Sequence, residues 1–165
     1  MKKRKTVVWG CSKLLEFYLE QHADNTFEAV IDSYYAKDFF NGLPVIRPDA
    51  VPNYKEATII IFAISSRAIQ AIISQLQHHG RALGENVFLY SDLCWDDFSD
   101  KVTSLTGAPA SPDLHSVAKS YYLNSVLNAV TSVAGSTLFL ELLSHTHGPV
   151  AEIGVFNGSN VVLGA

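Results

Sequence analysis

TVVWGCSKLLEFYLEQHADNTFEAVID, residues 6–32, is the stretch that decides the fold of this chain. Its first four residues are β-branched or aromatic and uncharged, which predicts a strand buried on both faces. Gly10 ends that strand, and the hydroxyl of Ser12 can cap a helix whose apolar residues recur at helical spacing. Phe27 to Ile31 reads as a second apolar strand, with Asp32 at its carboxyl end. Two strands joined by a helix pair in parallel through a right-handed crossover, so the stretch predicts a βαβ unit.

The alternation of strands and helices continues to about residue 95. Ala57 to Ile64 is a continuous β-branched run and predicts a central parallel strand. An alternating pattern of this kind predicts an α/β fold, here a Rossmann-like parallel sheet with flanking helices over residues 1–95. The other expected elements are a loop at 33–42, a short extended piece at 43–46, a helix at 65–80 and a strand at 86–90.

The sequence changes character after this domain. Residues 96–111 are acidic and then rich in Ser, Thr, Gly and Pro, which predicts a linker. Residues 112–148 are expected to form a helical connector, with one helix to about Ala134, a break at Gly135 and a second helix from 137 to 144. Residues 149–165 open the first strand and turn of a second α/β domain. The strands that would complete this domain do not follow, so this segment either adds one strand to another sheet or belongs to a truncated chain. Of these two interpretations we expect truncation.

Composition excludes several classes of protein. The net charge is −4, and four of the 12 basic residues lie within residues 1–5, so the remaining chain is more acidic still and no nucleic-acid partner is expected. The two cysteines, Cys11 and Cys94, lie in different predicted elements, which favours a reducing, cytoplasmic setting. No apolar segment is long enough for a membrane span, so no membrane partner is expected.

The turn at Gly10 stands where dinucleotide-binding proteins carry G-x-G-x-x-G. Only the first glycine is present, because Ser12 and Leu15 occupy the places of the second and third. Asp32 follows Gly10 by 22 positions, close to the spacing at which an acid accepts from ribose hydroxyls. Two interpretations stay open. Gly10, Ser12, Lys13 and Asp32 form a nucleotide site at a helix N-terminus, or the turn is structural and Asp32 caps its own loop.

Cysteine and histidine side chains are further candidates for chemistry. Cys11 lies at a predicted helix N-terminus, where the pKa of a thiol falls, although the sequence sets no histidine or acid beside it. His78 and His79 are adjacent, so on a helix their side chains point about a hundred degrees apart and cannot easily share an ion. His145 and His147 stand in a predicted turn without a further ligand at a metal-site spacing. We therefore expect surface histidines and no metal site.

Residues 151–160, AEIGVFNGSN, have the form of a strand with an acidic residue, followed by a glycine turn. The spacing Glu152-x-Gly154-x-x-x-Gly158 resembles motif I of class I methyltransferases of the macrocin O-methyltransferase and FkbM type, which act on sugars and natural products. Residues 138–143 also resemble the helix that these enzymes carry before motif I. The resemblance implies S-adenosylmethionine as cofactor, with Glu152, Gly154 and Gly158 in its binding loop. The family's catalytic base, ribose acid and metal ligands would lie beyond residue 165, so no catalytic residue is assigned.

The first ninety residues carry a second resemblance. VVWGCSKLL, then VID, GLPVI and a long apolar strand are similar to the Rossmann-like N-terminal domains attached to sugar acetyltransferases and to some sugar or polysaccharide methyltransferases. The first turn of those domains is usually richer in glycine than this one.

Together these features predict the N-terminal portion of a cytoplasmic methyltransferase dependent on S-adenosylmethionine. Its substrate would be a small molecule such as a sugar, glycan or natural-product precursor, and this chain alone should be inactive. Two alternatives stay open. One is a non-catalytic module that binds a nucleotide or nucleotide-sugar at the first turn. The other is an oligomerisation domain, because apolar helices at 112–144 would supply a surface for a homo-oligomer.

Overall fold

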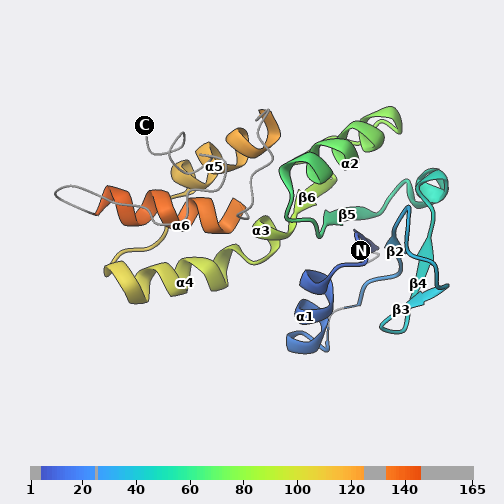
Figure 1. Cartoon of the computed structure of the whole chain (residues 1–165), viewed down its shortest axis with the longest axis horizontal. Helices are drawn as coiled ribbons and strands as arrows, with labels where there is room; N and C mark the ends of the chain where they lie inside the picture. Colours follow the sequence, from blue (N-terminus) through green and yellow to red (C-terminus); the bar gives the residue numbers. More distant parts are fainter. Residues whose placement is uncertain (1–4, 25, 125–132, 146–165) are drawn as a thin grey trace. The chain divides into compact units, whose positions relative to one another are not determined.

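The structure, a computed structural model, describes residues 5–24, 26–124 and 133–145 (Figure 1). The described residues form two compact units. The first comprises the described residues within Met1–Ala63 and Ala71–Leu93, and the second comprises those within Ile64–Gln70 and Cys94–Ala165. The first unit carries a sheet and its helices, whereas the described part of the second is helical.

A six-stranded sheet, in the order β3-β4-β2-β1-β5-β6, forms the centre of the first unit. All its neighbouring strands are parallel except β3, which pairs antiparallel with β4. This arrangement confirms the predicted α/β, Rossmann-like fold. The strands are β1 (Thr6–Trp9), β2 (Val30–Ile31), β3 (Phe39–Phe40), β4 (Leu43–Ile46), β5 (Thr58–Ile61) and β6 (Val87–Leu89).

Strand β1 lies at the centre because its apolar residues are covered on both faces. Val7 and Val8 are fully buried, and Trp9 is nearly so. β1 pairs with β5 along its whole length, from Thr6 opposite Thr58 to Trp9 opposite Ile61, and with β2 on its other side. The chain therefore leaves β1 for β2 on one side and later returns to β5 on the other.

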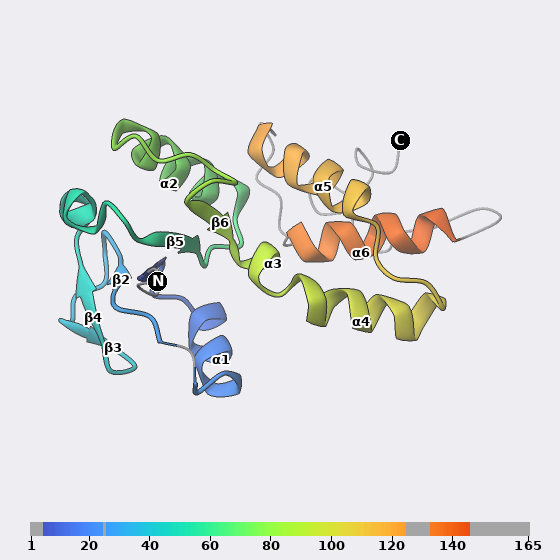
Figure 2. The same cartoon turned by 180° about the vertical axis from the view of Figure 1, so that it is seen from behind.

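Two helices cover opposite faces of this sheet, α1 (Lys13–Gln21) and α2 (Ser66–His78) (Figures 1 and 2). The crossover from β1 to β2 and the crossover from β5 to β6 run in opposite directions across the sheet. Because both are right-handed, their helices lie on opposite faces. On the α1 face, Tyr18 packs with the rings of Phe27, Phe62 and Tyr90. From α2, Ile72 and Leu76 are buried. Two short helices complete the unit, the 3-10 helix η1 (Pro48–Tyr54) and α3 (Tyr90–Leu93).

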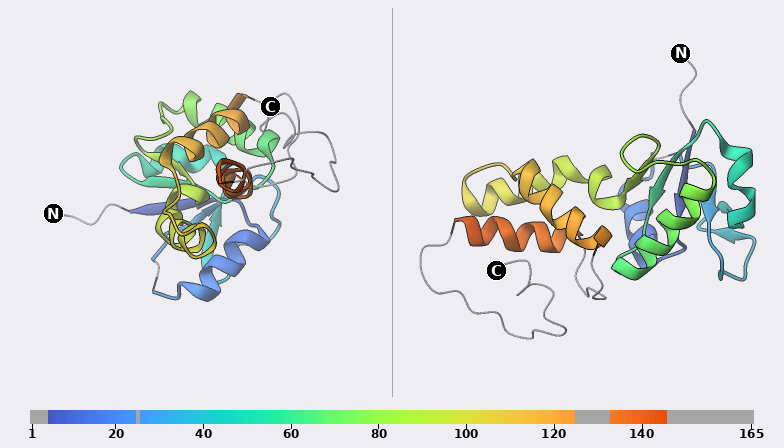
Figure 3. Two further views of the ribbon diagram at one scale, coloured as in Figure 1. Left: turned by 90° about the vertical axis from the view of Figure 1, so that its left-hand side faces the viewer. Right: turned by 90° about the horizontal axis from the view of Figure 1, so that it is seen from above.

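Three helices make up most of the described second unit: α4 (Trp95–Thr106), α5 (Pro112–Asn124) and α6 (Val133–Ser144) (Figure 3). Polar contacts join α5 to α6, because the buried carboxylate of Glu141 accepts from the amide of Ser111. His115 Nδ1 lies 3.2 Å from Thr137 Oγ1, and its ring packs on Trp95 of α4. The buried positions of α6 thus include polar side chains whose partners lie on α5 or on the residue that precedes it.

The sequence prediction was wrong in two places of the second unit. The stretch 96–111, expected to be a linker, lies largely within α4. Gly135 does not break a helix but lies inside α6, which starts at Val133. Glycine costs about 1 kcal/mol in a helix, and the packing of α6 against α4 and α5 is enough to offset this. Residues 125–132 and 146–165 lie outside the described residues.

The first unit also differs from its prediction in detail. The expected loop at 33–42 contains β3, whose Phe40 is buried and pairs with Leu43. The extended piece at 43–46 is β4, and of the two prolines after it Pro48 opens η1 and Pro52 lies inside it. Proline is favoured at the first position of a helix, where no N–H is needed.

Candidate functional site

Gly10 follows β1 in a conformation that suits only glycine. Its φ is +116°, and its amide donates to Ile31 O at 2.9 Å. A Cβ at this position would lie 2.8 Å from the backbone oxygen of Phe62, closer than any real contact. Gly10, the first glycine of the predicted nucleotide fingerprint, is therefore required because the backbone of Phe62, directly after β5, lies so close to it.

Ser12 caps α1, as the sequence predicted. Its backbone is extended, and its Oγ accepts from Leu15 N at 3.2 Å. The same hydroxyl donates to Phe62 O at 3.0 Å. Ser12 therefore ties the turn after β1 to the chain after β5, at the place where a fingerprint glycine would admit a pyrophosphate.

Asp32 follows β2 and lies against the same turn. Its Oδ2 accepts from Cys11 N at 2.8 Å, and its Oδ1 accepts from the amides of Tyr34 and Tyr35 at 2.8 and 2.9 Å. A carboxylate has about four acceptor sites, so three are already used by the backbone. The structure thus brings Gly10, Ser12 and Asp32 together, and Asp32 caps its own loop while holding the first turn.

Lys13 opens α1 with an exposed side chain. Its ammonium lies 2.6 Å from Glu16 Oε2. The hydrogen bond to Glu16, together with that negative charge, raises the pKa of Lys13. The backbone amides of Lys13 and Leu14 bind no acceptor within residues 5–24, 26–124 and 133–145. The start of α1 therefore keeps two N–H groups and a partial positive charge that an anion could use.

This turn lies where ligands bind in open α/β sheets. The strand order reverses at β1, since β2 lies on one side of it and β5 on the other. Ligands of such sheets bind outside the carboxyl ends of the strands at this reversal. The carboxyl end of β1 leads directly into Gly10 and the start of α1.

The thiol of Cys11 is not an activated nucleophile. Cys11 is half-buried, and burial, followed by the negative charge of Asp32, raises its pKa to about 12. The positive charge of Arg47 opposes this shift without cancelling it. Its position before a helix predicted a lowered pKa, and that expectation was wrong because desolvation and the nearby carboxylate outweigh the helix dipole.

Arg47 is the residue of this site that sequence reasoning missed. It follows β4, and its guanidinium donates to Asp32 O at 2.9 Å. A basic residue directly after the strand that neighbours β2 was the available signal. Parallel strands bring their carboxyl ends to one edge of the sheet, so Arg47 and Asp32 had to come close.

The remaining predicted site residues do not join this turn. His78 and His79 lie at the end of α2 and are exposed, with His78 Nδ1 2.7 Å from Ser74 O. His145 follows α6 and is exposed. Across the described residues, no three His, Cys, Asp or Glu side chains are grouped so that they could hold a metal ion. His147, Glu152, Gly154 and Gly158 lie outside the described residues.

No protein-family model matches the chain, and no curated protein and no solved structure matches it either. Among the helices of residues 5–24, 26–124 and 133–145, none has the length and apolar composition needed to cross a membrane.

Proposed function

We propose that this chain is the N-terminal part of a methyltransferase that uses S-adenosylmethionine and acts on a sugar, glycan or natural-product precursor. The observation that carries the proposal is the spacing Glu152-x-Gly154-x-x-x-Gly158 directly after a short apolar run. In motif I of such enzymes, a carboxylate ends the first strand and the glycines let the turn pass close to the cofactor. Helix α6, which ends at Ser144, stands where these enzymes carry a helix before motif I, and this supports the proposal.

The described first unit is then an accessory domain rather than the catalytic one. Methyl transfer in this class needs most of a seven-stranded sheet, so this chain alone supplies only one wall of a cofactor pocket. A half-built pocket bears the ordering cost of binding without most of its contacts. We also assign the protein to the cytoplasm, because the sequence has only two cysteines, Cys11 and Cys94, in different predicted elements, as expected in a reducing compartment.

The test is cofactor binding by the protein expressed from its complete reading frame. Glu152→Ala should weaken the binding of S-adenosylmethionine about 10- to 100-fold, the effect of losing a hydrogen bond to a charged group. Calorimetry on the parent and on this variant measures the change. Glu85→Ala removes an exposed glutamate outside motif I and should leave the affinity unchanged. A folded full-length protein that fails to bind S-adenosylmethionine would contradict the proposal.

A second candidate function is nucleotide or nucleotide-sugar binding at the turn after β1. The specific observation in its favour is that the backbone amides of Lys13 and Leu14 have no acceptor among the described residues. These amides lie at the point where the strand order reverses. Helix N-termini bind phosphate through such amides. Against it, the carboxylate of Asp32 is largely occupied by backbone amides, so little acceptor capacity remains for a ribose.

Lys13→Pro separates the amide from the side chain in a test of this second function. Proline is tolerated at the first helical position, and Ser12 already has the extended backbone that a following proline requires. If the turn binds a nucleotide, Lys13→Pro should weaken binding at least tenfold, whereas Lys13→Ala, which keeps the amide, should change it much less. The affinities are measured by titrating uridine diphosphate, adenosine diphosphate or nicotinamide adenine dinucleotide and monitoring amide chemical shifts. Unperturbed amides at residues 13 and 14 with all three ligands would leave only the structural role.

A further inference from the structure

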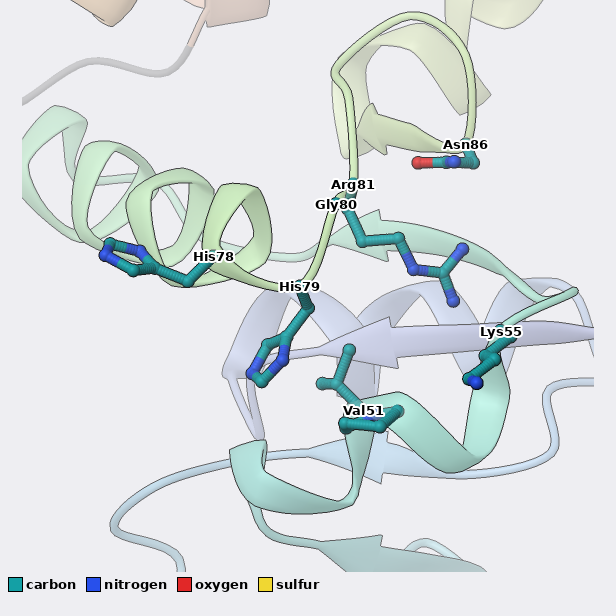
Figure 4. Close-up of a pocket in the computed structure, with 8 residues that line it drawn as sticks. Val51, Lys55, His78, His79, Gly80, Arg81 and Asn86 are labelled. Carbon is teal, nitrogen blue, oxygen red and sulfur yellow. The ribbon is translucent and has the colours of Figure 1, made fainter.

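A hollow lies at the amino ends of β5 and β6, whereas the turn after β1 lies at the carboxyl ends of the parallel strands. The hollow has a volume of about 470 Å³, in the range of small-molecule sites. Figure 4 shows that its walls come from η1, the turn after α2 and the residue that precedes β6. The residues that line it are Val51, Pro52, Lys55, His78, His79, Gly80, Arg81 and Asn86.

Two backbone hydrogen bonds fix the turn after α2, which forms one wall of the hollow. Gly80 has a φ of +68° and donates its amide to Gln77 O, while Arg81 N donates to Leu76 O. These two bonds form a Schellman motif, which satisfies carbonyls at the end of α2. The turn therefore fixes the residues on both sides of Gly80 relative to α2.

Arg81 joins this turn to the start of β5. Its side chain is buried, with 6% of the residue exposed. One guanidinium nitrogen donates to Ala57 O at 3.0 Å, and the other donates to Tyr54 O. The guanidinium thus fastens the end of η1 against the turn, and it places a fixed positive charge in the wall of the hollow.

The accessible groups around the hollow are cationic or hydrogen-bond donors. Lys55 and His79 are exposed, and among the described residues Lys55 has no ion-pair partner. Asn86 Oδ1 accepts from Ala82 N, so the amide nitrogen is the group that Asn86 can still offer. None of the described residues that line the hollow is an aspartate or a glutamate.

We propose that this hollow binds a small ligand through a phosphate or diphosphate group, with Lys55 and His79 as its direct partners. Figure 4 shows His79 and Arg81 extending from the turn toward η1, whereas His78 points to the opposite side from Lys55. The end of α2 carries a partial negative charge, but the carbonyls of Leu76 and Gln77 accept from amides of the turn. The positive charges of Lys55 and Arg81 also offset this negative end. Asn86 lines the same hollow, and its side-chain nitrogen is the group left to donate a further hydrogen bond.

This site is independent of the proposed methyltransferase and of the turn after β1. The hollow lies at the amino ends of β5 and β6, and the turn follows the carboxyl end of β1. A four-residue strand separates these edges by roughly 10–13 Å, at about 3.3 Å per residue. A ligand at one edge therefore perturbs different amides from a ligand at the other.

The experiment titrates inorganic pyrophosphate into the chain at fixed ionic strength and follows amide chemical shifts. We expect shifts at Gly80 and Asn86, and a dissociation constant about tenfold weaker in Lys55→Ala and in His79→Ala. Lys37→Ala removes an equal charge from the exposed surface of the same unit and should change the constant less than twofold. Citrate, titrated in parallel, tests carboxylate groups in place of phosphate and should bind more weakly.

Several outcomes would overturn the proposal. Absence of pyrophosphate binding, equal losses in Lys55→Ala and Lys37→Ala, or shifts confined to Lys13 and Leu14 would each do so. Tighter binding of citrate than of pyrophosphate would overturn the assignment of phosphate as the ligand group. Arg81 is left intact in every variant because its guanidinium holds two backbone carbonyls, so the variants test binding and not folding.

Discussion

Phe62→Ala should lower the free energy of unfolding of the first unit by about 3–5 kcal/mol, the usual cost of truncating a buried phenylalanine. Phe62 is fully buried directly after β5. Its ring centroid lies 5.0 Å from that of Tyr90 and 5.3 Å from that of Tyr18. Removing the ring leaves a cavity under α1 that its aromatic neighbours cannot fill. Urea unfolding, followed by far-ultraviolet circular dichroism, measures the loss.

Phe39→Ala is the matched control for this truncation. Phe39 belongs to the same sheet, but its side chain is 62% exposed. Its truncation should cost about 0.5 kcal/mol or less, as at most surface positions. Equal losses for the two variants would show that the aromatic cluster under α1 is not the core of this unit.

Gly10→Ala should destabilise the first unit by about 2–6 kcal/mol. Two costs add at this position, backbone strain of about 1–3 kcal/mol at an unfavourable φ and overpacking of about 1–3 kcal/mol. The added Cβ would meet a backbone oxygen, that of Phe62, which cannot move aside as a side chain could. Relief would require β1 and the chain after β5 to separate, and this would break the bond from Ser12 Oγ to Phe62 O. The same urea titration measures the loss.

Gly42→Ala separates the two costs. Gly42 also has a positive φ, +81°, but a Cβ there would meet no atom within 4 Å. Only the left-handed backbone is penalised, by about 1–2 kcal/mol. If Gly10→Ala lowers the free energy of unfolding no more than Gly42→Ala does, the short distance to Phe62 O does not require glycine at position 10.

The elements with strong local signals were predicted correctly. β1, α1 and β5 follow from runs of buried apolar residues and from the cap at Ser12, all of which are local in sequence. Helix α4 was missed because its residues are mostly polar and only Val102 is buried along it. Two local signals did mark its ends. Asp96 and Asp97 lie in its first turn, and Gly107 follows its last residue with a φ of +80°.

The sequence predicted that Gly10, Ser12 and Asp32 lie together, but it missed Arg47 and did not show which groups Asp32 binds. Spacing alone placed Gly10, Ser12 and Asp32 at one edge of a parallel sheet, because carboxyl ends of parallel strands share an edge. It did not show that the acceptor sites of Asp32 are taken by the amides of Cys11, Tyr34 and Tyr35. It also predicted the wrong direction for the pKa of Cys11, which depends on burial and on the neighbouring charge of Asp32.

By itself, the sequence determined the parallel α/β unit, since buried strand runs and helical periodicity are properties of neighbouring residues. The tertiary structure alone decided what meets around that sheet. Lys55 follows η1, Arg81 follows α2 and Asn86 precedes β6, and these residues line one hollow because parallel pairing of β5 with β6 brings the amino ends of both strands to one edge. The local pattern of each segment indicates its own secondary structure but not which residues of the other two segments it meets.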